Sequence, residues 1–287
     1  MRRPGNAEST PTSGESYQGL TPHRPKKSLG QHFLKDRSVS PRIANTAGIE
    51  PSDLIIEVGP GEGVLTEELA RRLDPNAGKL VAVELDSNLI PRLEERFASY
   101  PHVTIVHADV LEISPVALSV GRPYKLVANL PYYITSAILR HFLEATQKPV
   151  SLTVMVQREV AERMVARPPD MSLLAVSVQF YGRPSVAFRV PPGAFKPPPK
   201  VDSAVVHIDT YKPGENPLDL QDEQLFFKVA HAGFGQKRKQ LGNTLATGLG
   251  LPKEEAIVCL LQAGIDPSRR AETLSLQEWA ALTRAIS

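Results

Sequence analysis

The chain has 287 residues, of which 22% are charged and 41% hydrophobic, with 26 prolines and one cysteine. This length suits one large domain, or a medium domain with a smaller one. The single Cys259 excludes a disulfide framework and any zinc or iron–sulfur site built from clustered cysteines, and we predict no metal site. No apolar run approaches the ~18–20 residues of a membrane span. Without a signal core either, the chain is expected to be a reduced, cytoplasmic protein with no membrane contact.

The charge is divided unevenly along the chain. The net formal charge is only +2. Residues 53–123 hold twelve acidic and six basic side chains, a net charge of −6, so the remainder carries +8. This partition suggests that different surfaces serve different purposes, although unevenly solvated faces would explain it equally well.

The N-terminal 24 residues are rich in Pro, Gly, Ser and Thr, and this composition predicts a disordered tail over 1–24. From residue 53, patterns typical of strands and helices alternate. We expect strands at 54–59, 79–85, 103–110, 124–130 and 151–157, and helices at 64–73, 88–98, 135–147 and 158–166. Strands separated by helices in this way predict right-handed βαβ units and a parallel sheet covered on both faces.

The remainder of the chain changes character twice. The segment 171–182 is ambiguous, because it begins like a helix and ends like a strand, and 188–190 and 202–211 alternate like strands. Residues 212–220 break the pattern and suggest a linker. Beyond them only helical patterns remain, at 222–232, 235–247, 253–263 and 275–286, the last beginning with a capping box formed by Ser275 and Glu278. The predicted organisation is therefore an α/β domain over 25–211 and a small all-helical domain over 212–287.

A glycine-rich loop follows the first expected strand. The segment EVGPGEG contains Glu57, Gly59, Gly61 and Gly63, and glycines at a strand-to-helix turn let the backbone approach a ligand closely. A dinucleotide site of the form G-x-G-x-x-G would need Gly or Ala where Val64 stands. The pattern acid-x-Gly-x-Gly-x-Gly is instead typical of S-adenosylmethionine-dependent methyltransferases, which have a Rossmann-like α/β fold.

Two further acidic residues end the neighbouring strands. Glu84, at the end of the second strand, is placed to bind ribose hydroxyls, and Asp109, at the end of the third, is placed to accept a hydrogen bond from an adenine amino group. Both are expected beyond the carboxyl ends of parallel strands, where open α/β sheets bind their ligands. Together with the glycine loop they predict an S-adenosylmethionine pocket.

The fourth strand ends in Asn129, Leu130, Pro131 and Tyr132, which resembles the Asn/Asp-x-Pro-aromatic motif of methyltransferases that act on amino groups of nucleobases. The Asn129 side-chain oxygen and the carbonyl of either Leu130 or Pro131 can accept both hydrogens of adenine N6. They would thereby stabilise the positive charge that develops on this nitrogen. Proline fixes the turn, and Tyr132 can stack on a flipped base.

Motifs in order over some 260 residues resemble the bacterial small-subunit (16S) ribosomal RNA adenine N6,N6-dimethyltransferases, the KsgA (also RsmA) family. They are KKSLGQHFL (26–34), EVGPGEGVLTEEL, VAVELD, HADVLE, NLPYYITSAIL, FKPPPKVDSAVV (195–206), FGQKRKQLGNTL (234–245) and RRAETLSLQEWAAL (270–283). The resemblance implies dimethylation of two adjacent adenines in a hairpin loop near the 3′ end of the small-subunit RNA, a role in the biogenesis of that subunit, and a monomeric enzyme.

The same resemblance assigns residues to the two ligands. It implies cofactor contacts from His32, Leu34, Gly59, Glu84, Asp109 and Asn129, and a sandwich of the target adenine between Tyr132 and Phe195. His32 stands where this family more often has Asn, so either its side chain or its backbone could make the contact. Basic residues implied to contact RNA phosphates are Lys26, Lys27, Lys35, Arg37, Lys237, Arg238 and Lys239. For the last three, a solvated helix face is the alternative.

Other functions are less consistent with these motifs. A large-subunit RNA adenine methyltransferase that confers macrolide resistance is the nearest alternative, but we associate that group with Ile in place of Leu130. It also lacks the PPPKVDSAVV and GQKRKQLGN segments. A non-catalytic RNA-binding assembly or transcription factor on the same fold is disfavoured by the intact Glu84, Asp109 and NLPY. A dehydrogenase is opposed by Val64.

Overall fold

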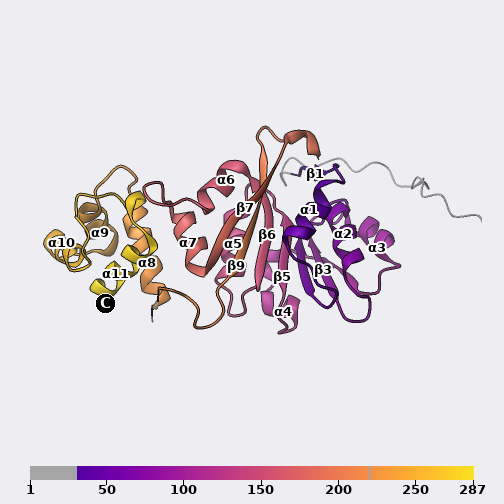
Figure 1. Ribbon diagram of the computed structural model, residues 1–287, viewed down its shortest axis with the longest axis horizontal. Helices are drawn as coiled ribbons and strands as arrows, with labels where there is room; N and C mark the ends of the chain where they lie inside the picture. The colour runs from indigo at the N-terminus through magenta and orange to yellow at the C-terminus, as the bar shows by residue number, and fades with distance from the viewer. Residues whose placement is uncertain (1–30, 219, 221) are drawn as a thin grey trace, which may run out of the picture.

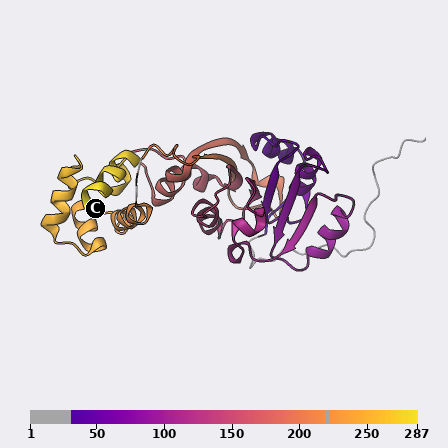
Figure 2. The same ribbon diagram turned by 90° about the horizontal axis from the view of Figure 1, so that it is seen from below.

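The computed structural model describes residues 31–218, 220 and 222–287. The predicted tail, with Lys26 and Lys27, lies outside the described residues. Figure 1 shows an elongated molecule, with a sheet and its covering helices at one end and a group of helices at the other. Figure 2 shows the same separation after a quarter turn. Among the described residues, no helix is long and apolar enough to cross a membrane.

Seven strands form the main sheet, in the spatial order β4-β3-β2-β5-β6-β9-β7. Their bounds are β2 (Leu54–Val58), β3 (Lys79–Glu84), β4 (Val103–His107), β5 (Lys125–Asn129), β6 (Ser151–Gln157), β7 (Gly182–Val190) and β9 (Ser203–Thr210). The first five pair in parallel, and β9 pairs antiparallel with both β6 and β7. From β2 the strand order runs to β3 and β4 on one side and to β5 and β6 on the other. The crevice at the boundary between β2 and β5 is the point where such sheets bind ligands.

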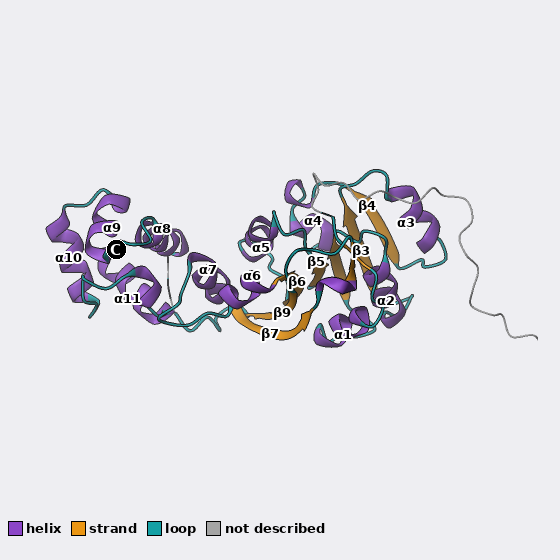
Figure 3. Cartoon of the chain, turned by 90° about the horizontal axis from the view of Figure 1, so that it is seen from above, coloured by secondary structure: helices purple, strands orange, loops and turns teal. Residues whose placement is uncertain are grey.

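Helices cover the two faces of the sheet, as Figure 3 shows from above. On one face, α1 (Val39–Thr46) and α2 (Val64–Arg72) bury apolar side chains against Ile55, Val127 and Met155. On the other, α4 (Pro115–Ser119), α5 (Thr135–Leu143), α6 (Arg158–Met164) and α7 (Leu173–Tyr181) share a larger core with the opposite side of the strands. α3 (Ile90–Phe97) packs beside β4 at the edge. The central strands β2, β3, β5 and β6 are mostly buried, which explains why their sequences are largely apolar.

The ambiguous segment 171–182 contains both elements. Ser172 caps α7, accepting a hydrogen bond from the Ala175 amide at 3.2 Å. The chain then enters β7 at Gly182, where a Cβ would lie 2.4 Å from the Asp209 carbonyl oxygen. The strand is longer than the predicted 188–190 because its first half is exposed and therefore lacks the apolar pattern of a buried strand. A short two-stranded sheet, β1 (Phe33–Leu34) with β8 (Phe195–Lys196), was not predicted.

The last four helices are α8 (Glu223–Phe234), α9 (Leu241–Leu249), α10 (Lys253–Gln262) and α11 (Leu276–Ile286). The capping box of Ser275 and Glu278 is confirmed. The prediction of a helix over 235–247 is wrong at its beginning, because residues 235–240 form turns. Gly235 ends α8 and five polar residues follow, so the chain has no apolar side chain to bury until Leu241. Cys259 is a buried free thiol.

Candidate active site

A pocket opens at the carboxyl ends of β2, β3 and β5, and residues 31–34 form one of its walls. It brings together most of the residues selected from the sequence. Those that line it are His32, Leu34, Glu57, Gly59, Gly61, Glu84, Asp109, Asn129, Leu130, Pro131 and Tyr132. Gly63 and Phe195 do not line it. The parallel register explains the convergence, since Val58 pairs with Val83 and Ala128, which places the ends of three strands side by side.

The glycine loop depends on backbone geometry that other residues adopt with strain. Gly61 has φ +59°, and a Cβ there would lie 2.9 Å from the Phe33 ring. Gly63 has φ +79° and precedes α2, where a Cβ would meet the Phe97 ring at the same distance. Gly61 therefore lets the N-terminal segment close against the pocket, while Gly63 lets α3 pack against the loop.

Glu84 anchors this loop from the neighbouring strand. Its carboxylate is only 6% exposed and accepts hydrogen bonds from the Gly61 amide at 3.1 Å and the Asp86 amide at 2.8 Å. Burial raises the pKa of Glu84, although the two amides counteract this shift. Each carboxylate oxygen accepts one amide hydrogen and keeps capacity for another donor. Such an arrangement suits a pair of ribose hydroxyls.

Glu57 is the most deeply buried acid of the pocket. It is 1% exposed, and its Oε2 has no hydrogen-bond partner among the described residues. Burial raises its pKa to about 8; the nearby Thr66 hydroxyl counteracts this shift, and the neighbouring Glu84 charge adds to it. Ionisation of this buried group without a hydrogen-bond donor at Oε2 is unfavourable unless a ligand supplies the donor. The ammonium group of S-adenosylmethionine is a ligand group that matches this need in charge and hydrogen bonding.

Asp109 follows β4 and begins a short 3₁₀ turn, Val110–Glu112. Its Oδ1 accepts a hydrogen bond from the Leu111 amide at 2.9 Å, and this cap holds the half-buried carboxylate at the pocket wall. Asp109 lies just beyond the end of the strand, as predicted, where it can accept a hydrogen bond from an adenine amino group.

The NLPY turn presents two acceptors. The Asn129 amide donates from Nδ2 to the His32 carbonyl at 3.3 Å, which leaves Oδ1 as the acceptor of that side chain. The Pro131 carbonyl already accepts from the Ile134 amide and the Thr135 hydroxyl, each at 3.2 Å. The Leu130 carbonyl has no such partner among the described residues. Of the two carbonyls that the sequence left open, Leu130 is thus the one available.

Tyr132 is held at both ends of its side chain. Its hydroxyl hydrogen-bonds to the Ser203 Oγ at 2.7 Å, and its ring stacks against His32 with centroids 5.6 Å apart and planes inclined by 28°. Burial raises the Tyr132 pKa, partly offset by the Ser203 hydrogen bond, so the phenol stays neutral at physiological pH. Sequence reasoning assigned no function to Ser203 or Phe33, although both lie in the family motifs, because their contacts join segments that are distant along the chain.

Phe195 lies in β8, where it pairs with Leu34, and its side chain is 1% exposed. It belongs to the core under α1 and α2, among Ile43 and Val205. In this arrangement the ring is not open to the pocket. A role for Phe195 in sandwiching a base stays a prediction and requires the loop that carries it to move.

The described basic candidates are exposed and form no ion pair with any described residue; they are Lys35, Arg37, Lys237, Arg238 and Lys239. The first two follow β1, and the Lys35 amide donates to the Ala194 carbonyl at 2.9 Å, beside the pocket wall. The last three lie on the loop between α8 and α9, which we call the basic loop (236–240). They are therefore on a turn and not on the predicted helix face.

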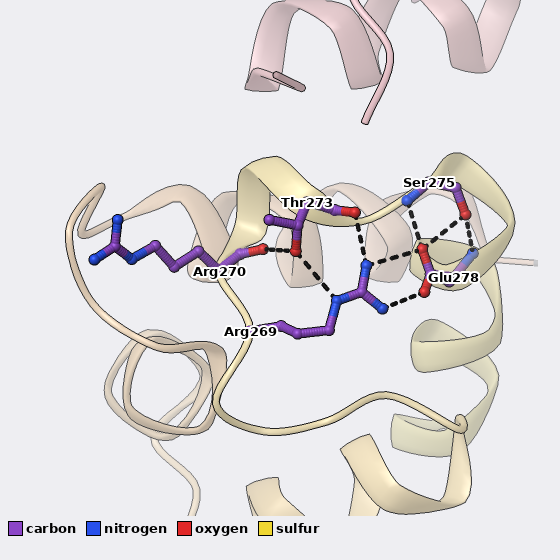
Figure 4. A network of polar contacts seen from close by, with 5 residues as sticks. All are labelled: Arg269, Arg270, Thr273, Ser275 and Glu278. Atoms are coloured by element: carbon purple, nitrogen blue, oxygen red, sulfur yellow. Dashed lines mark hydrogen bonds and ion pairs between the residues drawn. The ribbon is translucent and has the colours of Figure 1, made fainter. Parts of the chain in front are cut away.

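A polar network lies next to the C-terminal end of the basic loop, and Figure 4 shows its residues. The Arg269 guanidinium pairs with the Glu278 carboxylate and donates to the Thr273 carbonyl at 2.6 Å. The Arg269 carbonyl in turn accepts from the Leu241 amide at 2.8 Å, at the point where α9 begins. The network fixes the C-terminal end of the basic loop. Sequence analysis found its capping box but not the contribution of Arg269.

Known proteins match this architecture. The dimethyladenosine transferase of Plasmodium falciparum superimposes with a TM-score of 0.73 at 23% identity, covering 88% of this chain and 96% of that one. The 23S rRNA methyltransferase ErmE superimposes with a TM-score of 0.69 at 28% identity, covering 88% and 98%. The α/β sheet with its glycine loop and the C-terminal helices are those of an S-adenosylmethionine-dependent methyltransferase.

The family is given by sequence. The model of the ribosomal RNA adenine dimethylase family matches residues 22–287. A curated relative from Dehalococcoides mccartyi, Ribosomal RNA small subunit methyltransferase A, is 53% identical over 93% of this chain and 90% of its own length. Its namesake from Alkaliphilus metalliredigens is 41% identical over 91% of each chain. The chain belongs to the ribosomal RNA adenine dimethylase family and is an S-adenosylmethionine-dependent enzyme.

Proposed function

We propose that this protein transfers methyl groups from S-adenosylmethionine to N6 of two adjacent adenines in the 3′-terminal hairpin loop of small-subunit (16S) ribosomal RNA. The observation that carries this proposal is a pair of acceptors, Asn129 Oδ1 and the Leu130 carbonyl, which no described residue occupies and which lie at the end of an acid-lined pocket. These two acceptor oxygens match the two hydrogens of an exocyclic amino group.

The proposed chemistry assigns a function to each side of the pocket. When bound, S-adenosylmethionine supplies a methyl carbon on a cationic sulfur, and the reaction exchanges that carbon–sulfur bond for a carbon–N6 bond. Asn129 and Leu130 hold the N6 hydrogens and stabilise positive charge on the nitrogen through their oxygen dipoles. The extra N6 proton then leaves to solvent, so no strong base is required. Glu57 binds the cofactor ammonium group, Glu84 the ribose and Asp109 the adenine of the cofactor.

Sequence identity to known proteins favours small-subunit RNA over large-subunit RNA as the substrate. The curated relatives at 53% and 41% identity carry a small-subunit name, whereas the large-subunit methyltransferase ErmE is 28% identical. Unpaired loop bases also cost less to flip than paired ones. We assign the phosphate contacts to Lys35, Arg37 and the basic loop, which leave their charges unpaired among the described residues.

A monomer acting in the cytoplasm completes the proposal. We assign every role in the reaction to residues of this one chain, which supports a monomer. The proposed substrate, bacterial ribosomal RNA, is assembled into subunits in the cytoplasm.

The test is direct. Purified protein is incubated with S-adenosylmethionine and with immature small subunits, naked small-subunit RNA or large subunits. We expect N6-dimethyladenine at two adjacent positions of the small-subunit RNA, measured by mass spectrometry of nuclease digests. Dimethyladenine confined to large-subunit RNA would favour the macrolide-resistance alternative, and no methylated adenine in any substrate would refute the proposal.

A further inference from the structure

His32 makes three contacts that all lead to the target-base side of the pocket. Its imidazole stacks on Tyr132, its Nδ1 lies 2.8 Å from the Pro197 carbonyl oxygen, and its own carbonyl accepts from the Asn129 amide. A carbonyl oxygen can only accept, so Nδ1 carries the hydrogen of this bond. The His32 ring therefore has a defined orientation, and one residue joins three separate segments of the chain.

The contact with Asn129 determines which atom of the amide is available. The carbonyl of His32 can only accept, so the Asn129 amide must direct Nδ2 toward it at 3.3 Å. Oδ1 is then left for an incoming donor. Without this contact, the amide could rotate and offer Nδ2 to the amino group of the base, which would repel it.

The contact with Tyr132 restrains the ring on which the base would stack. Ser203 holds the phenol hydroxyl and His32 covers one face of the ring, so the ring is fixed in position and tilt. We assign the opposite face to the base. A stack of two protein rings offers a more rigid platform than one ring alone, because less side-chain freedom is lost when the base arrives.

The contact with Pro197 ties the platform to the loop after β7. Pro197 follows β8, which carries Phe195, and the antiparallel pairing of β1 with β8 brings this loop to the N-terminal segment. The imidazole thus links the loop to Tyr132. An asparagine at position 32 could donate to the same carbonyl, but it has no ring to stack.

We propose that His32 is a positioning residue for the target adenine: its backbone orients the Asn129 amide, and its side chain fixes the Tyr132 ring and the Pro197 loop. This assignment rests on the proposed function, in which Asn129 and Tyr132 hold the base. The His32 side chain, which the sequence assigned to the cofactor, is thereby assigned to the RNA substrate. The assignment also explains why an aromatic ring is useful at this position in this chain.

The experiment compares three substitutions in the full-length protein. His32→Ala removes ring and donor, His32→Phe keeps a ring, and His32→Asn keeps a donor. We expect His32→Ala to lower kcat about 10- to 100-fold, as expected for a misplaced substrate, with the calorimetric Kd for S-adenosylmethionine changed less than about threefold. His32→Phe and His32→Asn should each recover part of the rate, because each restores one of the two contacts.

A second readout is the ratio of products. After the first transfer, N6 retains a single hydrogen for the two acceptors, so the second transfer relies more on stacking. His32→Ala should therefore release more N6-monomethyladenine relative to N6-dimethyladenine, and His32→Phe should reverse this shift. His141→Ala is the matched control, since His141 also bonds a carbonyl, that of Ile113, at 2.9 Å and contacts a ring, that of Phe142. This control should leave kcat and the product ratio unchanged.

A third measurement does not depend on methylation. Nitration of Tyr132 by tetranitromethane, scored by peptide mass spectrometry against the 58% exposed Tyr133, should rise in His32→Ala in the absence of RNA. Unchanged nitration would overturn the positioning role even if the protein proved to methylate another substrate. The role would also be overturned if kcat stayed at the wild-type value, or if weaker cofactor binding accounted for the whole loss.

Discussion

The cofactor pocket buries acidic side chains, whereas the basic loop exposes its basic side chains to solvent. In the pocket, Glu57 and Glu84 are buried, and burial raises the pKa of both. In the basic loop, Lys237, Arg238 and Lys239 are exposed and unpaired among the described residues. The difference fits the proposal that the pocket binds a small cationic cofactor and the basic loop a polyanion, which need opposite environments. A desolvated acid discriminates strongly, whereas exposed cations contribute contacts that salt can tune.

The two regions nevertheless share one construction principle. In each, an ionisable side chain holds backbone in place: Glu84 binds the Gly61 amide, and Glu278 secures Arg269, whose carbonyl binds the Leu241 amide. Burial raises the pKa of Glu278, but hydrogen bonds from Arg269 and Ser275 outweigh this and hold it below its usual value. The groups to which we assign binding are thus held in place by the chain itself, which would limit the ordering cost of binding.

The largest effect should come from Asn129. We expect Asn129→Ala to lower kcat about 100- to 1,000-fold, as removal of one preorganised polar group does in other enzymes. RNA affinity should stay within about threefold of wild type. Single-turnover methylation and filter binding measure the two quantities. Asn76→Ala is the control, because Asn76 is exposed on a turn remote from the pocket residues. A variant with unchanged turnover would remove Asn129 from the chemistry.

A smaller effect should come from the basic loop. Substituting Lys237, Arg238 and Lys239 together with Ala should weaken binding of a small-subunit hairpin RNA about 10- to 100-fold at low salt. The slope of log Kd against log salt should fall by about 2, since each phosphate contact contributes about 0.7–0.9. Fluorescence anisotropy at several salt concentrations measures the slope. Lys253→Ala, which removes an exposed cation from α10, should leave it unchanged. An unaltered slope in the triple variant would make the loop a solvated surface.

The smallest effect concerns pH and Glu57. The folded protein holds the Glu57 proton up to about pH 8, against 4.5 ordinarily. The stability due to this group is therefore greatest below about pH 4.5 and falls as pH rises to about 8. The affinity for S-adenosylmethionine has the opposite pH dependence, because the ammonium group binds the ionised form of Glu57. S-adenosylmethionine should bind about 10-fold more tightly at pH 8 than at pH 6, and binding should release a proton.

Calorimetry in buffers of different ionisation enthalpy measures both the affinity and the released proton. Glu57→Gln should bind more weakly at pH 8, show little pH dependence between 6 and 8, and lose less stability over that range. Asp74→Asn is a control on an exposed turn. If wild type and Glu57→Gln shared one pH profile, the ammonium group would have another partner.

Much of the pocket was predictable because its residues follow strands. Glu84 and Asp109 could be placed beside the glycine loop without a structure, since parallel strands end at one edge of the sheet. The helix at 235–247 was mispredicted at its beginning because local pattern cannot distinguish a polar turn from a polar helix end. The choice between the Leu130 and Pro131 carbonyls needed the bonds that Pro131 makes to the next helix.

The division of charge along the chain, the order of the elements and the identity of the chemical groups are properties of the sequence by itself. They depend on residue type and spacing, which are local. Only the tertiary structure decides which groups are buried, paired or free. It buries Phe195, gives Glu57 Oε2 no partner within the described part of the chain, and brings His32 against Tyr132, 100 positions along the chain. These outcomes depend on contacts between distant segments, whose geometry no local pattern encodes.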